Sequence, residues 1–120
     1  GSTPLFDCLR GHENIVKYLV EHGANINKED KYGITPLFNI CYVGYNDIVE
    51  YLVEHGANIN KENNYGRTPL FYACEGGIEI IVEYLVEHGA NINKEDNDGK
   101  TPLFYARRKR YEDIIECLIK

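Results

Sequence analysis

The sequence has little of what hydrolytic, membrane or nucleic-acid-binding proteins use. Its only serine is Ser2, which excludes a Ser-His-Asp catalytic site. No apolar run approaches the roughly 18 residues of a membrane-spanning helix, so no membrane is expected as a partner. Basic residues are outnumbered, with 13 Lys and Arg against 19 Asp and Glu and a net charge of −6. This balance argues against nucleic acid, whose binding depends on the neutralisation of phosphates.

Cysteine is also scarce, and the four residues are not placed for disulfides. Cys8, Cys41 and Cys74 recur every 33 residues, which puts them at equivalent positions. Packed helices lie about 8–10 Å apart, whereas a disulfide needs Cα atoms within about 7 Å. Cys117 falls outside this series and has no obvious partner. We expect four buried, reduced thiols and a cytoplasmic protein, with the nucleus as the alternative.

The remaining reactive side chains do not predict a catalytic or metal site. Cys8 and His12 are close in sequence but lack an orienting third group. His22, His55 and His88 are evenly spaced, and a line of identical positions does not converge on a tetrahedral metal. We expect no enzyme activity, no metal and no cofactor, and we interpret the three histidines as residues that end helices.

What the sequence has in abundance is repetition. The twelve letters YLVEHGANINKE occur at 18–29, 51–62 and 84–95, with an offset of 33 residues. The letters TPLF also recur, beginning at Thr3, Thr35, Thr68 and Thr101. A fixed period of roughly 20 to 50 residues indicates a stacked-repeat protein, in which the core lies between neighbouring repeats.

Each period predicts two helices. In the second period, Pro36 suits the first turn of a helix, where its missing N–H costs nothing, and Gly44 ends that helix. Another helix is expected to begin near Asn46 and Asp47, whose side chains suit the unbonded N–H groups of a helix start, and to end before Gly56. The apolar faces expected in the core are Leu37, Ile40 and Cys41 in the first helix and, in the second helices, Ile15/Val16/Leu19/Val20, Ile48/Val49/Leu52/Val53, Ile81/Val82/Leu85/Val86 and Ile114/Ile115/Leu118/Ile119.

This pattern resembles the ankyrin repeat, whose unit reads roughly T-P-L-H, a short helix, G-H, a second helix, G-A-D-V-N and a turn with glycine. The resemblance covers the chain apart from its first two residues, and it implies an all-α repeat solenoid of stacked helix pairs joined by projecting hairpin loops. We expect residues 1–2 to be a cloning remnant on a fragment of a longer chain. We expect residues 3–120 to form one domain, with repeats at 3–34, 35–67 and 68–100 and a partial capping repeat at 101–120.

The two ends depart from the pattern. The first repeat is one residue short between Thr3 and Cys8, and one residue shifts the phase of a helix by about 100°, so we expect an irregular helix there. In the last repeat, the run from Arg107 to Arg110 is interpreted as a solvated cap, with a nuclear-import or anion-binding patch as the alternative. We expect a monomer, with weak end-to-end self-association as the alternative.

Differences between the repeats predict a binding surface. They gather at the turn tips and near the end of each first helix, at Lys31, Tyr32, Ile34, Tyr42, Val43, Asn64, Tyr65, Arg67, Glu75, Asp98, Lys100, Arg108 and Lys109. In ankyrin proteins these positions line a concave partner-binding face. Aromatic residues and arginine are enriched at interface cores, so the predicted partner-binding residues are Tyr32, Ile34, Tyr42, Val43, Tyr65 and Arg67. The alternative is that turn tips simply tolerate change.

Three asparagines share another position of the repeat. Asn27, Asn60 and Asn93 each follow a leucine by eight residues, and the resemblance implies a substrate pattern for asparaginyl hydroxylation. The alternative role is to brace the loop.

Three functions fit the whole sequence. The preferred one is a non-enzymatic scaffold that presents a groove to a protein or peptide. The others are a structural spacer in a longer repeat array and an accessory region of an enzyme whose catalytic domain lies outside these residues.

Overall fold

A computed structural model describes residues 13–119 of the chain. Within this range the chain forms seven α-helices and no strand. In chain order they are α2 (Glu13–Glu21), α3 (Pro36–Val43), α4 (Asn46–Glu54), α5 (Pro69–Gly76), α6 (Glu79–Glu87), α7 (Pro102–Lys109) and α8 (Glu112–Ile119). The predicted irregular helix near Thr3, the thiol of Cys8 and the expected remnant at residues 1–2 lie outside the described residues.

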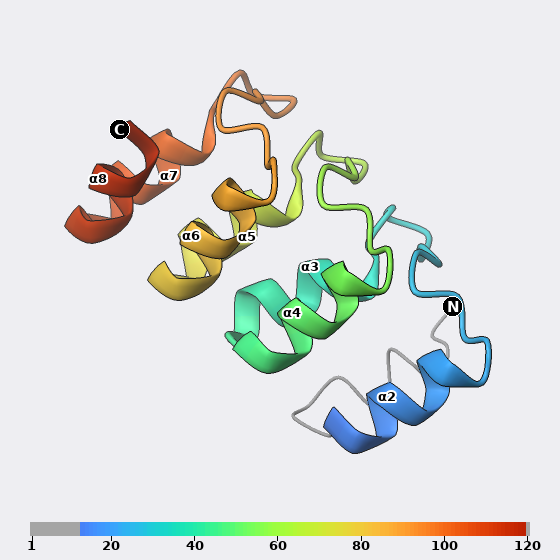
Figure 1. Ribbon diagram of the computed structural model, residues 1–120. Helices are drawn as coiled ribbons and strands as arrows, with labels where there is room; N and C mark the ends of the chain where they lie inside the picture. The colour runs from blue at the N-terminus through green and yellow to red at the C-terminus, as the bar shows by residue number, and fades with distance from the viewer. Residues whose placement is uncertain (1–12, 120) are drawn as a thin grey trace.

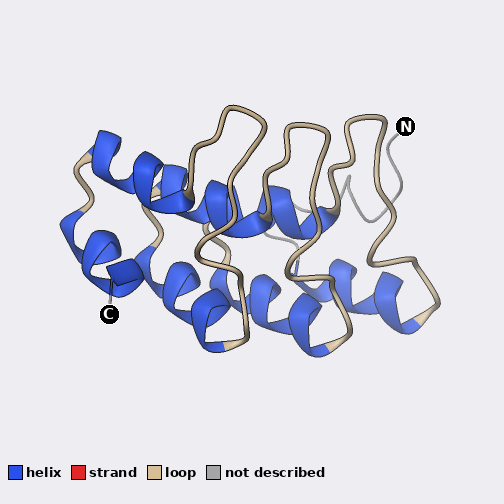
Figure 2. Cartoon of the chain, turned by 90° about the horizontal axis from the view of Figure 1, so that it is seen from above, coloured by secondary structure: helices blue, strands red, loops and turns tan. Residues whose placement is uncertain are grey.

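The helices stack as pairs in chain order, α3 with α4, α5 with α6 and α7 with α8 (Figure 1). The first helix of each pair packs on the first helix of the next pair, and the second helices pack on one another in the same way. This makes two layers, and the hairpin loops project to one side of the layer formed by α3, α5 and α7 (Figure 2). The predicted all-α repeat solenoid is confirmed.

The first helix of each pair begins and ends as the sequence predicts. Proline occupies the first turn of α3, α5 and α7. Gly44 and Gly77, with φ of 90° and 72°, end α3 and α5 in the left-handed conformation. Arg110 takes the same place after α7 with φ of 61°, and it is the only non-glycine residue with positive φ between residues 13 and 119. An L-residue there costs roughly 1–2 kcal/mol, so the last repeat holds backbone strain that its neighbours avoid.

The second helix of the pair begins where expected but is not capped as expected. Helix α4 starts at Asn46, with Tyr45 at the N-cap and no side chain bonded to the exposed N–H groups. The amide Oδ1 of Asn46 is instead buried without a hydrogen-bond partner. The capping role predicted for Asn46 is therefore wrong. Asp47 lies in the first turn, where its negative charge interacts favourably with the positive end of the helix dipole.

The core lies between neighbouring helix pairs. Leu52 of α4 and Leu85 of α6 are both 0% exposed. The expectation of burial fails for two isoleucines: Ile15 on α2 is 46% exposed and Ile119 on α8 is 58% exposed. Both lie on the outermost helices of the described stack, where second-layer helices pack on one side only.

The thiols follow the same trend from centre to edge. Cys41 and Cys74 are fully buried and are not joined by a disulfide. Burial raises the pKa of Cys74 to about 12, with smaller contributions from Cys117 and Glu75, and burial alone raises the pKa of Cys41 still further. Neither thiol therefore ionises near neutral pH as a nucleophile must. Cys117 is only half-buried because α8 is the outermost helix, so the expectation of four buried thiols is wrong at this position.

Candidate binding surface

One asparagine ties each of the first two hairpin loops to the next. Asn27 Nδ2 donates to the carbonyl of Gly56 at 3.0 Å, and Asn27 Oδ1 accepts from the N–H of Asn58 at 2.8 Å. Asn60 makes the same two bonds to the following loop, at 3.1 and 2.9 Å. These two side chains therefore brace neighbouring loops, and their hydroxylation stays a prediction.

The third asparagine of this series differs. The backbone N–H of Asn93 donates to Asn91 Oδ1 at 3.0 Å, as its counterparts do within their own loops. Its side chain is exposed and makes no hydrogen bond to any described residue. Of the three predicted hydroxylation sites, Asn93 alone presents an unengaged amide.

A single side-chain oxygen shapes each turn. Asp30 Oδ1 accepts from the N–H groups of Tyr32 and Ile34 at 2.8 and 3.0 Å. Asn63 and Asp96 repeat both bonds in their own turns, at 2.9–3.0 Å. Each oxygen satisfies two N–H groups of its turn, which fixes the backbone beneath the exposed tip.

Neighbouring turns are also bonded to each other. The N–H of Asn64 donates to the carbonyl of Tyr32 at 2.8 Å, and that of Asn97 donates to the carbonyl of Tyr65 at 3.0 Å. This close approach favours Gly66, because its φ is 74° and a Cβ there would lie 3.0 Å from the backbone nitrogen of Asn97. The backbones of both tip tyrosines are therefore held from their own turn and from the next one.

Four of the predicted binding residues are well exposed on this rigid frame. Tyr32 and Tyr65 at the turn tips are 47% and 52% exposed, and Tyr42 and Val43 at the end of α3 are 56% and 53% exposed. Ile34 is half-buried. We call the turn tips and the ends of α3, α5 and α7 the variable face, since the repeats differ most there.

Arg67 lies on this face but is bonded inside the protein. Its Nε contacts Asp96 Oδ2 at 3.2 Å, its Nη1 contacts Glu75 Oε1 at 3.4 Å, and its Nη2 donates to the Tyr105 hydroxyl at 2.8 Å. The guanidinium also lies 4.8 Å from the centre of the Tyr105 ring. Tyr105 in turn donates its hydroxyl proton to Asp96 Oδ2. The donor that the sequence predicted for a partner is thus engaged by three side chains of the chain itself.

The sequence matches a known protein family. A family model described as ankyrin repeats, in three copies, matches residues 1–63 and residues 60–120. The chain belongs to the ankyrin repeat family. Ankyrin repeats are in general protein–protein interaction modules, and their domains are typically non-catalytic. No sequence among the curated proteins matches this chain significantly.

Three histidines of the ankyrin domain end helices, as expected. His22, His55 and His88 each place Nδ1 2.8 Å from the carbonyl oxygen four residues earlier, and each imidazole stacks 4.0 Å from the tyrosine ring at that position. Between residues 13 and 119, no three His, Cys, Asp or Glu side chains are grouped to hold a metal ion. The same range contains no helix of the length and apolar character needed to cross a membrane.

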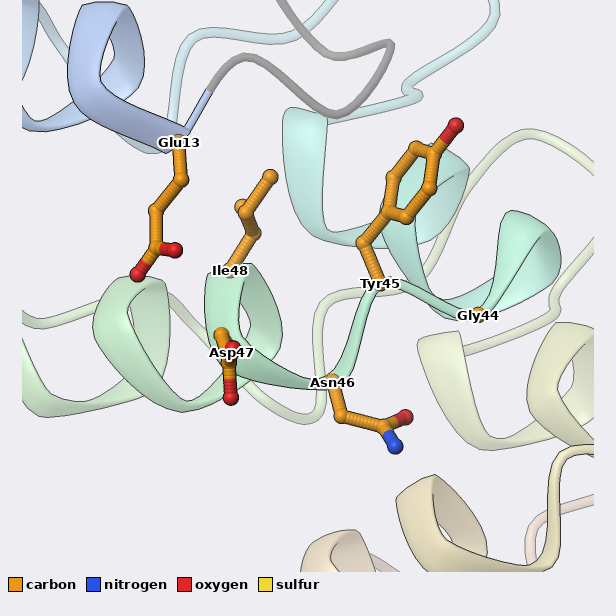
Figure 3. A pocket seen from close by; sticks show the side chains of 6 residues that line it. All are labelled: Glu13, Gly44, Tyr45, Asn46, Asp47 and Ile48. Carbon is orange, nitrogen blue, oxygen red and sulfur yellow. The ribbon is translucent and has the colours of Figure 1, made fainter.

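The ankyrin domain also has a shallow hollow of about 350 Å³ beside the connection between α3 and α4 (Figure 3). It is lined by Glu13, Gly44, Tyr45, Asn46, Asp47 and Ile48. Among the described residues, two carboxylates and one amide line it, without a thiol, an imidazole or a cation. This set offers no nucleophile with an adjacent base. We assign no function to this hollow.

The side chains that sequence reasoning missed are Asp96 and Tyr105. Asp96 is buried, and its two oxygens serve the turn and the Arg67 network respectively. One signal was available: Arg67 replaces Ile34 of the previous repeat, and Asp96 replaces Asn63. A cation in one turn and a carboxylate in the next turn are candidates for an ion pair.

Proposed function

We propose that this ankyrin domain is a non-enzymatic module whose variable face binds a protein or a peptide. The observation that carries the proposal is the set of four exposed apolar or aromatic side chains, Tyr32, Tyr42, Val43 and Tyr65, on turns and helix ends that hydrogen bonds hold in place. Rigid aromatic anchors lose little conformational freedom on binding, so a preorganised surface of this kind favours association.

The predicted residues take different roles in this proposal. The three tyrosines are the anchors, because they combine a large ring with a polar hydroxyl. Ile34 and Val43 add apolar area beside them. Arg67 holds the turn before α5 to Tyr105 of α7, so it supports the surface and does not itself reach the partner.

The proposal places the domain in the cytoplasm, with the nucleus as the alternative, and treats it as a monomer. Cys41 and Cys74 are buried thiols that are not joined to each other. Such thiols are usual in reducing compartments.

Affinity capture from a cell extract tests the proposal. The bait carries Tyr32→Ala together with Tyr65→Ala, and captured proteins are quantified by mass spectrometry against the unmodified bait. We expect affinity for a captured partner to fall at least a hundredfold, about 2.7 kcal/mol, because few residues carry most of the energy of an interface.

A matched control lies on the opposite layer. Glu54 and Glu87 end α4 and α6 and are exposed, so Glu54→Lys with Glu87→Lys leaves the variable face unchanged. Capture should survive this pair of substitutions. Suppose the glutamate variant loses the partner while the tyrosine variant keeps it, with both folded by circular dichroism. The binding surface would then be the layer that contains α4 and α6, and the proposal would be wrong.

A further inference from the structure

The variable face consists of three equivalent sets of four positions, which we call rungs. Each rung has the third residue of a turn, the residue after the turn glycine, and two residues at the end of the following helix. Rung 1 is Tyr32, Ile34, Tyr42 and Val43; rung 2 is Tyr65, Arg67, Glu75 and Gly76; rung 3 is Asp98, Lys100, Arg108 and Lys109.

Contacts within the rungs show that the turn and the helix end form one surface. In rung 2, Arg67 Nη1 lies 3.4 Å from Glu75 Oε1. In rung 3, Lys100 Nζ lies 4.8 Å from the centre of the Phe104 ring, and the guanidinium of Arg108 lies 5.9 Å from the same centre. In rungs 2 and 3, the second and third positions therefore lie near each other in space.

The three rungs differ in charge. Rung 1 has no charged side chain, although Lys31 lies beside it with Nζ 5.1 Å from the centre of the Tyr32 ring. In rung 2, the charge of Arg67 is offset by that of Glu75. Rung 3 has three cations against the single carboxylate of Asp98. The face thus changes from apolar to neutral to cationic along the stack.

The cations around rung 3 have no acidic partner within residues 13–119. Lys100, Arg107, Arg108, Lys109 and Arg110 form no ion pair with any residue between 13 and 119, in a chain whose net charge is −6. Glu95, Asp96 and Asp98 lie in the turn of rung 3, and a further group of carboxylates lines a hollow in the other layer, between α6 and α8: Glu79, Glu83, Glu87, Asp113 and Glu116. Positive charge is therefore concentrated on one face of an acidic protein.

An apolar hollow of about 480 Å³ adjoins these cations. It is lined by Thr101, Leu103, Phe104, Arg107 and Arg108. Phe104 is exposed at its edge, and its ring packs edge-on against that of Tyr105 at 5.2 Å. A carboxylate seated there would meet two guanidinium groups, which bind carboxylates in bidentate geometry.

We propose that the partner of the variable face is an extended protein segment, apolar or aromatic at one end and rich in Asp or Glu at the other. The apolar end lies on rung 1 and the acidic end on rung 3. This inference rests on the proposed function and adds the chemistry and direction of the ligand. Packed helices lie about 8–10 Å apart, so three rungs span about 20 Å, which an extended chain covers with about six residues.

A displayed library of random octapeptides tests this chemistry without a known partner. Selection on the unmodified domain should enrich peptides with apolar residues at one end and Asp or Glu at the other, in one preferred direction. A synthetic peptide of the enriched sequence should bind less tightly as salt is raised, since exposed charge pairs are screened.

Two charge reversals give the matched comparison. Lys100→Glu should weaken that peptide at least tenfold, and Arg108→Glu should do the same. Lys28→Glu makes the same change of charge at an exposed lysine outside the rungs that forms no ion pair with a described residue, and it should change affinity less than twofold. Circular dichroism establishes that all three variants are folded.

The outcomes separate this inference from the proposed function. Enriched peptides that lack acidic residues, or that ignore Lys100→Glu and Arg108→Glu, would overturn the inference and leave a peptide-binding face. No enrichment at all would overturn both. Tighter binding of a single-stranded DNA decamer than of the enriched peptide would make the cations a nucleic-acid site and would also overturn the inference.

Discussion

The turns that precede α5 and α7 use one scaffold in two ways. Asn63 and Asp96 occupy the same position, and each gives its Oδ1 to two backbone N–H groups of its turn. The other terminal atom of the side chain differs, because it is Nδ2 in Asn63 and Oδ2 in Asp96. Asn63 Nδ2 donates to the Tyr72 hydroxyl at 2.8 Å, whereas Asp96 Oδ2 accepts from Tyr105 and from Arg67.

This comparison separates what the turn requires from what it tolerates. The turn requires one oxygen, which an amide and a carboxylate both supply. The turn does not fix the remaining atom, which in Asp96 is an oxygen that binds Arg67, and Arg67 in turn contacts Glu75. We call the contact of Asn63 with Tyr72 the first junction and the contacts of Asp96 with Tyr105 and Arg67 the second junction. The first junction is a single neutral hydrogen bond. The second junction is an ionic network of four side chains, those of Arg67, Glu75, Asp96 and Tyr105.

The largest loss of stability should come from substitutions in the hydrophobic core between the helix pairs. Leu52→Ala and Leu85→Ala should each lower the free energy of unfolding by about 2–5 kcal/mol, because each leaves a cavity between packed helix pairs. Urea unfolding measures the change. A loss below about 0.5 kcal/mol, the range of ordinary surface substitutions, would reject the stacked register.

Removing one hydroxyl from each junction tests their difference directly. Tyr105→Phe should cost about 1–3 kcal/mol, since it removes a buried partner from Asp96 and from Arg67. Tyr72→Phe should cost only about 0.5–1.5 kcal/mol, because it removes one neutral bond. Equal losses for the two variants in urea unfolding would show that the ionic network adds nothing.

Only the second junction should respond to acid. Burial raises the pKa of Asp96, but hydrogen bonds from Tyr105, from the N–H groups of Lys100 and Asp98, and from Arg67 outweigh it and hold the pKa below its usual value. The contribution of Asp96 is thus fully present above the unfolded pKa of about 4 and is lost as pH falls through the lower folded pKa.

The variant Asp96→Asn gives the second junction the uncharged side chain of the first. We expect its stability to fall less steeply than that of the unmodified protein between about pH 5 and pH 2, as measured by urea unfolding at each pH. Parallel curves would mean that Asp96 does not contribute to the acid response.

The smallest effect concerns the loop asparagines. Asn60→Ala should cost about 1 kcal/mol, since Asn60 makes two bonds to the next loop. Asn93→Ala should stay within about 0.5 kcal/mol, because the side chain of Asn93 has no such bonds. Thermal unfolding of the two variants side by side measures the difference, and a larger loss at Asn93 would contradict it.

Local signals were enough to predict most of the fold. Proline at the first turn, glycine after the last turn and a recurring apolar quartet specify each helix pair, and the period specifies how the pairs stack. Where prediction failed, the cause was position along the stack. Ile15, Ile119 and Cys117 are apolar residues that we expected in the core, but they lie on the outermost helices, which have a neighbouring helix on one side only.

The candidate surface was less readable. The period gave the positions of the turn tips, so exposure at Tyr32 and Tyr65 followed from the pattern. The fate of Arg67 did not, because Tyr105 is 38 residues away and meets it only once the pairs have stacked. A residue type favoured at interfaces is also a type that forms internal networks, and sequence alone does not distinguish the two.

The bonds between loops have a consequence for how such a protein changes its size. Those of Asn27 and Asn64 join residues 29, 31 or 33 positions apart, so none reaches beyond the adjacent loop. An in-frame duplication of residues 35–67 would therefore keep these loop bonds at both of its edges, although the first copy of Arg67 would face Asn63 in place of Asp96. Genetic gain or loss of one unit then lengthens or shortens the binding face by a whole rung, with only the contacts of Arg67 changed.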